Sequence, residues 1–116
     1  MPVKQHTERQ HPRVRTSVLV HYGTGTPDRS SYAETVSEGG IYIRTNDTLK
    51  VGTRLAVCID FPDRQVRLRG EVVWSIRVPE HLERDMVCGM GIRFLGGDLE
   101  WPTFFRRWRK GAAGQR

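Results

Sequence analysis

Apolar and polar residues alternate with a period of two along most of this chain. The clearest series is Leu55, Val57, Ile59 and Phe61, which alternate with Arg54, Ala56, Cys58 and Asp60. This spacing predicts β-strands that bury one face and expose the other. The pattern recurs often enough to predict six strands, which cover residues 18–22, 32–36, 41–45, 55–61, 66–74 and 88–94.

The fifth predicted strand is the longest, and its apolar residues share one face. We expect that face to lie in the core and the charged residues between them to lie outside. The residues expected to face the core are Val66, Leu68, Gly70, Val72 and Trp74.

Short turns join most of these strands, as at Pro62-Asp63-Arg64, where the composition is typical of a hairpin turn. Gly70, Gly89 and Gly91 lie inside strand patterns, where glycine often marks the bulges and bends of a small barrel. We therefore predict an all-β antiparallel barrel or sandwich.

The period changes near the C-terminus. Trp101, Phe104, Phe105 and Trp108 are spaced i, i+3, i+4 and i+7, which predicts one face of a helix that Gly111 would cap. We expect this aromatic face to cover the open end of the barrel, since so small a barrel needs those rings to fill its core. The alternative is a basic amphipathic helix that binds a membrane or a partner.

Length and charge narrow the functional classes. A chain of 116 residues is long enough for one domain with one core. Its net charge of +6 favours anionic partners.

The sequence has no apolar run as long as a membrane span and no signal peptide, so we expect a cytoplasmic protein without membrane insertion. Cys58 and Cys88 are far apart, which favours two reduced thiols over a metal site or a disulfide framework.

The sequence offers no catalytic motif. The four histidines are scattered, and none lies in a pattern of a metalloprotease, a serine hydrolase or a phosphate-binding loop. We therefore predict a binding protein, not an enzyme.

Two segments contain residues that are suited to binding a ligand. Arg9 and Arg13 lie four residues apart ahead of the first predicted strand, and a Ser37-Glu38-Gly39-Gly40 turn leads directly into another strand. Arginine can bind phosphate and guanine through two parallel hydrogen bonds. Ser37 offers a hydroxyl, and Gly40 permits a planar ligand to approach the backbone closely.

The segments Arg9-Gln10-His11-Pro12-Arg13 and Thr35-Val36-Ser37-Glu38-Gly39-Gly40 resemble the two signature segments of the bacterial PilZ domain family. Those signatures are Arg-x-x-x-Arg and Asp/Asn-x-Ser-x-x-Gly, and Thr35 occupies the position of the Asp or Asn. The order of strands followed by a helix also matches, so the resemblance runs from about Glu8 to Lys110.

The resemblance implies a small six-stranded antiparallel β-barrel with a C-terminal α-helix covering one end. It divides the chain into a flexible N-terminal arm at residues 1–8, the barrel domain with its helix at residues 9–111, and a disordered tail at residues 112–116.

It further implies that the ligand is cyclic di-GMP and that no resident cofactor is needed. By resemblance, Arg9 and Arg13 close over the dinucleotide, while Ser37 and Gly40 form its floor and Thr35 offers a single neutral oxygen. The signal would pass to an unidentified protein effector in motility, pilus or exopolysaccharide control.

Two alternatives remain open at this point. One is a degenerate PilZ adaptor that binds protein and no nucleotide. The other is a basic barrel that binds single-stranded nucleic acid through Arg67, Arg69, Tyr42 and Trp74. Nucleic acid is the least favoured partner because most aromatic residues fall on predicted core faces.

Overall fold

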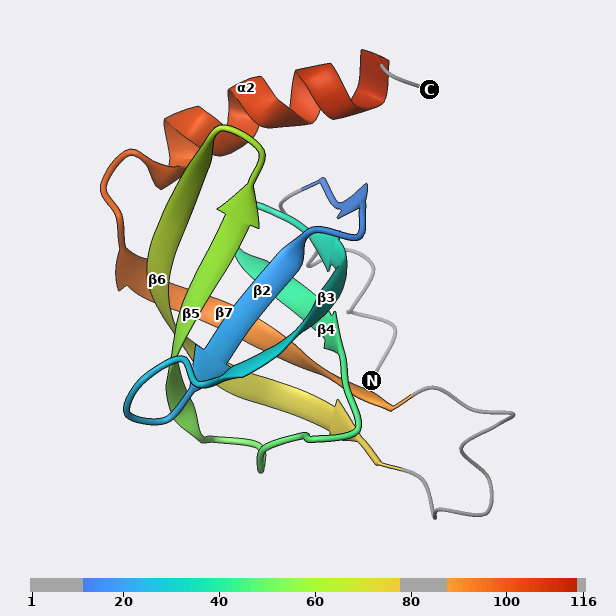
Figure 1. Ribbon diagram of the computed structural model, residues 1–116, viewed down its shortest axis with the longest axis vertical. Coiled ribbons are helices and arrows are strands. Elements are labelled where there is room, and N and C mark those ends of the chain that lie inside the picture. Colours follow the sequence, from blue (N-terminus) through green and yellow to red (C-terminus); the bar gives the residue numbers. More distant parts are fainter. Residues whose placement is uncertain (1–11, 78–87, 115–116) are drawn as a thin grey trace, which may run out of the picture.

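The computed structural model describes residues 12–77 and 88–114, which form a β-barrel with one helix across its end (Figure 1). The predicted arm at residues 1–8 and Arg9 lie outside the described residues. The elements in chain order are β1 (Val14–Arg15), β2 (Leu19–Gly23), β3 (Arg29–Val36), β4 (Gly40–Arg44), β5 (Arg54–Phe61), β6 (Arg64–Ile76), β7 (Gly89–Gly97) and α2 (Trp101–Gly114).

Six antiparallel strands close into a barrel in the order β3-β2-β5-β6-β7-β4, because β4 pairs back with β3. This confirms the predicted six-stranded barrel. The additional strand, β1, pairs with the last two residues of β3, beyond the part of β3 that pairs with β2. β1 was not predicted from the sequence, because two residues are too few to show a period of two.

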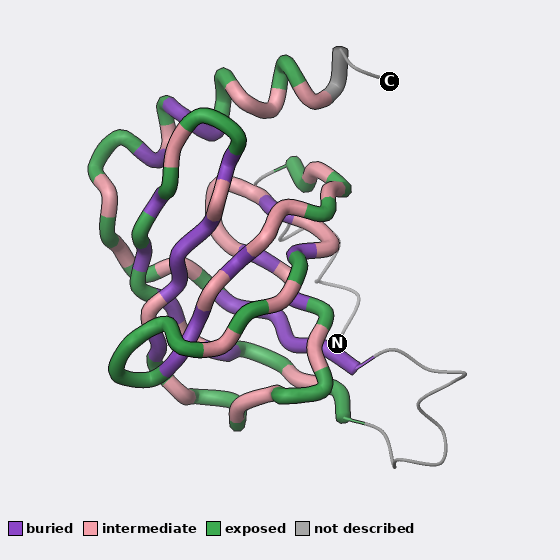
Figure 2. The backbone as a smooth tube through the Cα atoms, viewed as in Figure 1, coloured by how far each residue is buried: buried purple, intermediate pink, exposed green. Residues whose placement is uncertain are grey.

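The barrel is filled by the inward face of each strand, and Figure 2 shows buried and exposed residues alternating along the chain. In β6, Val66, Leu68, Gly70 and Val72 are buried as expected. Trp74 is not: 39% of its surface is exposed, so its predicted place in the core is wrong. The pairing of β6 with β7 shifts between Val72 and Trp74, and this bulge turns the indole to the outer surface.

The helix α2 covers one end of the barrel, as the aromatic spacing predicted (Figure 1). Trp101, Phe104 and Phe105 are buried against the core, and Trp108 packs beside them. Phe61, at the end of β5, contacts Phe104 and Trp108 edge to face, at centroid distances of 4.8 and 5.0 Å. Such aromatic pairs contribute about 0.5–1.5 kcal/mol each beyond the area they bury.

The helix does not end at Gly111, as the sequence analysis expected, but continues to Gly114. Among the described residues, only Gly52 and Gly97 have the positive φ that a capping glycine commonly adopts. Ala112 and Ala113 follow Gly111 and are strong helix formers, which favours the extra turn. No helix within the described ranges is long and apolar enough to cross a membrane.

We predict that Phe105→Ala lowers the free energy of unfolding by about 3–5 kcal/mol, because the ring is almost fully buried under α2. The measurement is chemical denaturation of the variant beside the wild type. Thr103→Ala, on the exposed side of the same helix, is the control and should change stability by less than about 0.5 kcal/mol. Equal stabilities for Phe105→Ala and the wild type would show that α2 does not contribute to the core.

Candidate ligand-binding site

The turn between β3 and β4 is closed by hydrogen bonds within itself. The Ser37 amide donates to the Gly40 carbonyl at 2.8 Å, and the Gly40 amide donates to Ser37 Oγ at 3.1 Å. Ser37 Oγ also lies 3.3 Å from the Gly40 carbonyl oxygen. In this structure the serine hydroxyl therefore holds the turn in shape, and a ligand that used it would compete with these bonds.

Position 40 has room only for glycine, because strand β7 lies directly behind it. A Cβ atom at this position would overlap the carbonyl oxygen of Ile92 in β7. The next contact along the turn is a hydrogen bond from the Phe94 amide to the Gly39 carbonyl, at 2.9 Å. The glycine thus lets the turn press against β7, whether or not a ligand approaches it.

Glu38 ties the turn to the helix. Its carbonyl oxygen accepts a hydrogen bond from the Trp101 indole N–H at 2.8 Å. Its carboxylate contacts Arg106 Nη2 at 3.2 Å and Nε at 3.3 Å. Both the main chain and the side chain of Glu38 are therefore engaged by α2.

Thr35 lies just after a bulge in β3. The pairing of β3 with β4 shifts between Ala33 and Thr35, so that Glu34 is an extra residue without a partner on β4. Ala33 and Val36 are both buried, whereas Glu34 and Thr35 are partly exposed. The bulge therefore presents two consecutive side chains at the outer surface, where a regular strand would present one.

Thr35 belongs to a row of residues paired across five strands. It lies opposite Arg15 on β1 and Tyr42 on β4, and the row continues through Gly91 on β7 to Trp74 on β6. Directly paired residues share a face of the sheet, so this row extends along the outside of the barrel.

Two aromatic rings lie at the far end of this row. The centroids of Tyr42 and Trp74 are 4.9 Å apart, with the ring planes tilted by 38°. A side chain at Gly91 would overlap the indole of Trp74, and one at Gly89 would overlap the ring of Tyr42. The rings therefore lie directly on the backbone of β7. Tyr42 and Trp74 were named together only for the nucleic-acid alternative, and the favoured prediction placed Trp74 in the core, although the alternating glycines of β7 were a visible signal of close approach.

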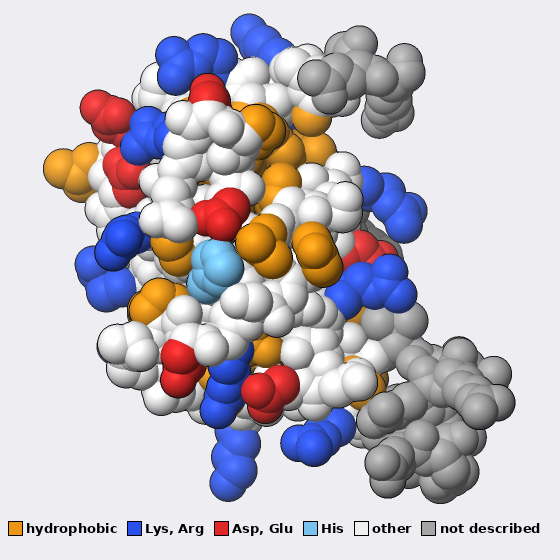
Figure 3. All heavy atoms as spheres, in the orientation of Figure 1, with side chains coloured by type: hydrophobic (Ala, Val, Ile, Leu, Met, Phe, Trp, Pro, Cys, Tyr) orange, Lys and Arg blue, Asp and Glu red, His pale blue; other side chains and the backbone are white. Residues whose placement is uncertain are grey.

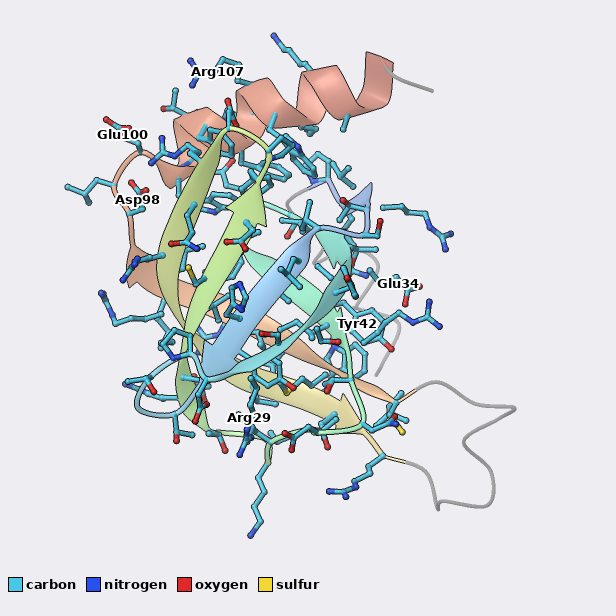
Figure 4. All side chains as sticks on the ribbon, in the orientation of Figure 1. Arg29, Glu34, Tyr42, Asp98, Glu100 and Arg107 are labelled. Carbon is cyan, nitrogen blue, oxygen red and sulfur yellow. The ribbon has the colours of Figure 1, made fainter. Side chains whose placement is uncertain are left out.

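The charges around Thr35 are mixed. Glu34 lies 3.8 Å from Arg15 Nη2 and 3.6 Å from Arg44 Nε, distances longer than hydrogen bonds. Glu34 and Tyr42 lie close together on the barrel wall (Figure 4). Burial raises the pKa of the Tyr42 phenol, and the charge of Glu34 raises it further. Figure 3 shows basic and acidic side chains interspersed on the outside of the barrel.

Arg13 is exposed and directly precedes β1. Val14 pairs with Val36, so Arg13 and Ser37 are each one residue beyond that pair. The short strand β1 therefore brings Arg13 to the same corner as Thr35, Ser37 and Gly40. Of the five predicted site residues, the described part of the chain brings these four together, and Arg9 lies outside it. Arg15 was not predicted, although its spacing of two from Arg13 would place both side chains on one face of a strand.

A shallow cavity of about 370 Å³ lies alongside this corner. Glu34 and Arg44 line it, together with Thr16, Ser31 and Tyr32. The cavity adds the exposed ring of Tyr32 and the hydroxyl groups of Thr16, Ser17 and Ser31 to the charged residues near Thr35.

A second polar group lies on the wall formed by β2, β3 and β5. His21 Nδ1 is 2.7 Å from Ser30 Oγ, and its Nε2 is 3.0 Å from Asp60 Oδ2. Asp60 also accepts a hydrogen bond from Gln65 Nε2 at 2.7 Å. The residue types are those of a hydrolase triad, but Ser30 is exposed on β3, and the side chains of His21 and Asp60 are also partly exposed to water. We interpret these side chains as a polar group that links neighbouring strands through hydrogen bonds.

Within residues 12–77 and 88–114, no group of three or more potential ligands could hold a metal ion. Cys58 and Cys88 are both buried, and neither forms a disulfide. Burial raises the pKa of the Cys58 thiol, which makes it less reactive than an exposed cysteine.

The chain matches the sequence profile of the PilZ domain family over residues 7–101. Several solved structures share its fold. The Bacillus subtilis inhibitor of motility, MotI or DgrA, superposes with a TM-score of 0.77 at 16% identity, covering 94% of this chain and 52% of that one. The PilZ domain of Escherichia coli YcgR, solved with c-di-GMP, gives 0.66 at 11% identity, covering 93% of each chain.

The PilZ domain of CeSA from a cellulose-synthesising bacterium gives a TM-score of 0.59 at 12% identity, covering 86% of this chain and 96% of that one. At these identities the likeness establishes the fold. The chain spans about half the length of MotI. No curated protein sequence is similar enough to this chain to count as a relative.

We predict that Gly40→Ala destabilises the protein by about 1–3 kcal/mol, because the new Cβ would press on the backbone of β7. Gly25→Ala is the matched control, since a Cβ there meets nothing within 4 Å. Thermal and denaturant unfolding of the two variants provide the test. A Gly40→Ala variant as stable as Gly25→Ala would mean that the turn can move away from β7 at no cost.

A pH-dependent effect is expected at Asp60. Hydrogen bonds from Gln65 and then from His21 lower its pKa below the usual value of 3.8. Since the folded-state pKa is the lower one, the carboxylate stabilises the fold above about pH 4, and this stabilisation is lost as the pH falls through the folded-state pKa.

Asp60→Asn should therefore cost less than about 1 kcal/mol near neutral pH, the range of a partly exposed pair, and the difference from the wild type should shrink as the pH falls below about 4. The measurement is urea denaturation across that range. Asp63→Asn, in the exposed turn after β5, is the control. A difference that grows on acidification would contradict the assignment.

Proposed function

This chain belongs to the PilZ domain family, whose members are binding and adaptor proteins, and from that premise we propose that it is a receptor for cyclic di-GMP. The ligand has two guanine bases and two phosphodiesters, and hence a charge of about −2, which suits a protein with a net charge of +6.

The observation that carries this proposal is the convergence of four predicted site residues on one corner of the barrel. The pairing of β1 with β3 brings Arg13 beside the turn that begins at Ser37. The pairing of β3 with β4 places Thr35 on the outer surface, next to Tyr42. A flat ligand lying on this corner would contact the arginine arm and the turn at once.

Each part of the corner has a role suited to such a ligand. Arg13, together with Arg9 on the arm, would bind phosphate oxygens or the guanine edge through paired hydrogen bonds. Thr35, Ser37 and Gly40 would form the floor. The exposed face of the Tyr42–Trp74 pair offers a surface on which a purine can stack, an interaction of about 1–3 kcal/mol per base.

The output of this receptor would be a contact with a protein effector. The name of MotI describes an inhibitor of motility, and the YcgR domain was solved with c-di-GMP. By analogy with these proteins we propose a role in motility, with pilus or exopolysaccharide control as the other candidates.

The second candidate is an adaptor that binds protein and no nucleotide. Two observations favour it. Thr35 offers only a hydroxyl where the family signature has the carboxylate of Asp or the amide of Asn, and the Ser37 hydroxyl is already bonded within its own turn. The two candidates differ in one measurable property, which is affinity for the dinucleotide.

We predict that the wild type binds cyclic di-GMP in a calorimetric titration and that Arg9→Ala and Arg13→Ala each weaken binding at least tenfold. Removing one charge-assisted contact costs about 1.5–3 kcal/mol, which is ten- to a hundredfold in affinity. Arg107→Ala is the control, because Arg107 is exposed on the far side of α2 (Figure 4). A well-folded wild type without affinity would favour the adaptor, and full affinity in both arginine variants would exclude the arm as the clamp.

A further inference from the structure

We propose that Glu34, the residue inserted by the bulge of β3, is the side chain that selects guanine at this site. It would supply the carboxylate that is absent at Thr35. The inference rests on the proposed function, because it concerns how the dinucleotide is recognised.

The bulge is what makes Glu34 available. Ala33 and Val36 both face the core, so the two residues between them share the outer surface. Glu34 and Thr35 are neighbours in the chain at a point where the strand shows both to solvent. Thr35 pairs directly with Tyr42, and Figure 4 shows Glu34 near that ring, at the aromatic end of the row.

The nearby Glu38 is committed elsewhere. Its carboxylate contacts Arg106 on α2 through two nitrogens, and its carbonyl oxygen is held by Trp101. By contrast, Glu34 lies 3.8 Å from Arg15 and 3.6 Å from Arg44. Charge-assisted hydrogen bonds are about 2.7–2.9 Å long, so neither arginine holds the Glu34 carboxylate tightly.

This loose arrangement suits a ligand that carries both phosphates and bases. Arg15 and Arg44 flank Glu34 and can turn towards phosphate oxygens when an anionic ligand arrives. The carboxylate is then left without a cationic partner and with both oxygens able to accept hydrogen bonds. The base that lies over Thr35 and Tyr42 would donate hydrogen bonds to these two oxygens.

Guanine and adenine differ at the edge that such a carboxylate would meet. Guanine presents the N1–H and the N2 amino group side by side, and a carboxylate accepts a hydrogen bond from each. Adenine presents a lone pair at N1 and no amino group at C2, so the same carboxylate would face it unpaired. A buried or half-buried polar group left unpaired is a strong source of discrimination.

The competing explanation is that Glu34 only neutralises Arg15 and Arg44. In that case Glu34→Gln would release two positive charges and bind any cyclic dinucleotide more tightly. Cyclic di-GMP and cyclic di-AMP carry the same phosphodiester charge, so both affinities would rise together. The ratio of the two affinities therefore separates base recognition from simple charge balance.

The experiment is a set of calorimetric titrations with cyclic di-GMP and cyclic di-AMP. The proteins are the wild type, Glu34→Gln, the double variant Glu34→Gln/Thr35→Asp, and Glu71→Gln as a matched control. The side chains of Glu71 and Glu34 are 24% and 29% exposed, and each carboxylate is paired with an arginine. Melting temperatures show that each variant is folded.

We expect the wild type to prefer cyclic di-GMP at least a hundredfold. Glu34→Gln should lose tenfold or more in affinity for cyclic di-GMP and none for cyclic di-AMP. The double variant should regain most of that loss, because it returns a carboxylate one residue along the bulge, and Glu71→Gln should behave as the wild type.

An unchanged ratio of the two affinities in Glu34→Gln would overturn the role of Glu34 while leaving the receptor function intact. A wild type that binds neither dinucleotide would overturn both proposals. The two failures are therefore distinguishable in one series.

Discussion

The barrel closes where β4 enters between β3 and β7, and Gly40 is the residue that permits this close approach. The backbone of Ile92 lies so near that no side chain fits at position 40. The amide of Phe94 then binds the carbonyl of Gly39, so β7 holds the turn through its main chain. Because these contacts are between backbones, they leave the turn little freedom. The shape of the candidate site is therefore set by the closure of the barrel.

The helix reinforces the same corner from the other side. Glu38 is held by the indole of Trp101 and by the guanidinium of Arg106. Trp101 is also part of the aromatic cluster that fills the end of the barrel. The core and the candidate site thus share residues, and a change in the packing of α2 would reach the turn through Trp101 and Arg106.

The sequence predicted most of the fold because a strand with one buried face leaves a period of two in the chain. The six barrel strands and the aromatic face of α2 follow from that rule and its helical counterpart. The rule fails wherever a bulge adds a residue. Trp74 was assigned to the core because the period was counted through the shift after Val72. Strand β1 leaves no period at all, since it has only two residues.

The motif residues of the candidate site could be predicted from the sequence, whereas the residues that the fold brings beside them could be predicted less well. Thr35, Ser37 and Gly40 are continuous in the chain, so their proximity needed no tertiary information. The closeness of Arg13 to that turn and of Trp74 to Tyr42 depends on strand register, which the sequence does not state. The hydrogen bonds of Ser37 and the attachment of Glu38 to α2 could likewise be found only in three dimensions.

The bulge at Glu34 also affects how this surface can change by insertion or deletion. Removing Glu34 would leave Ala33 facing inward, Thr35 outward and Val36 inward, which is the alternation of an ordinary strand. No other residue of β3 would change face, and the pairing with β4 would become regular. A single codon can therefore add or remove an acidic group at this surface without altering the register of the barrel.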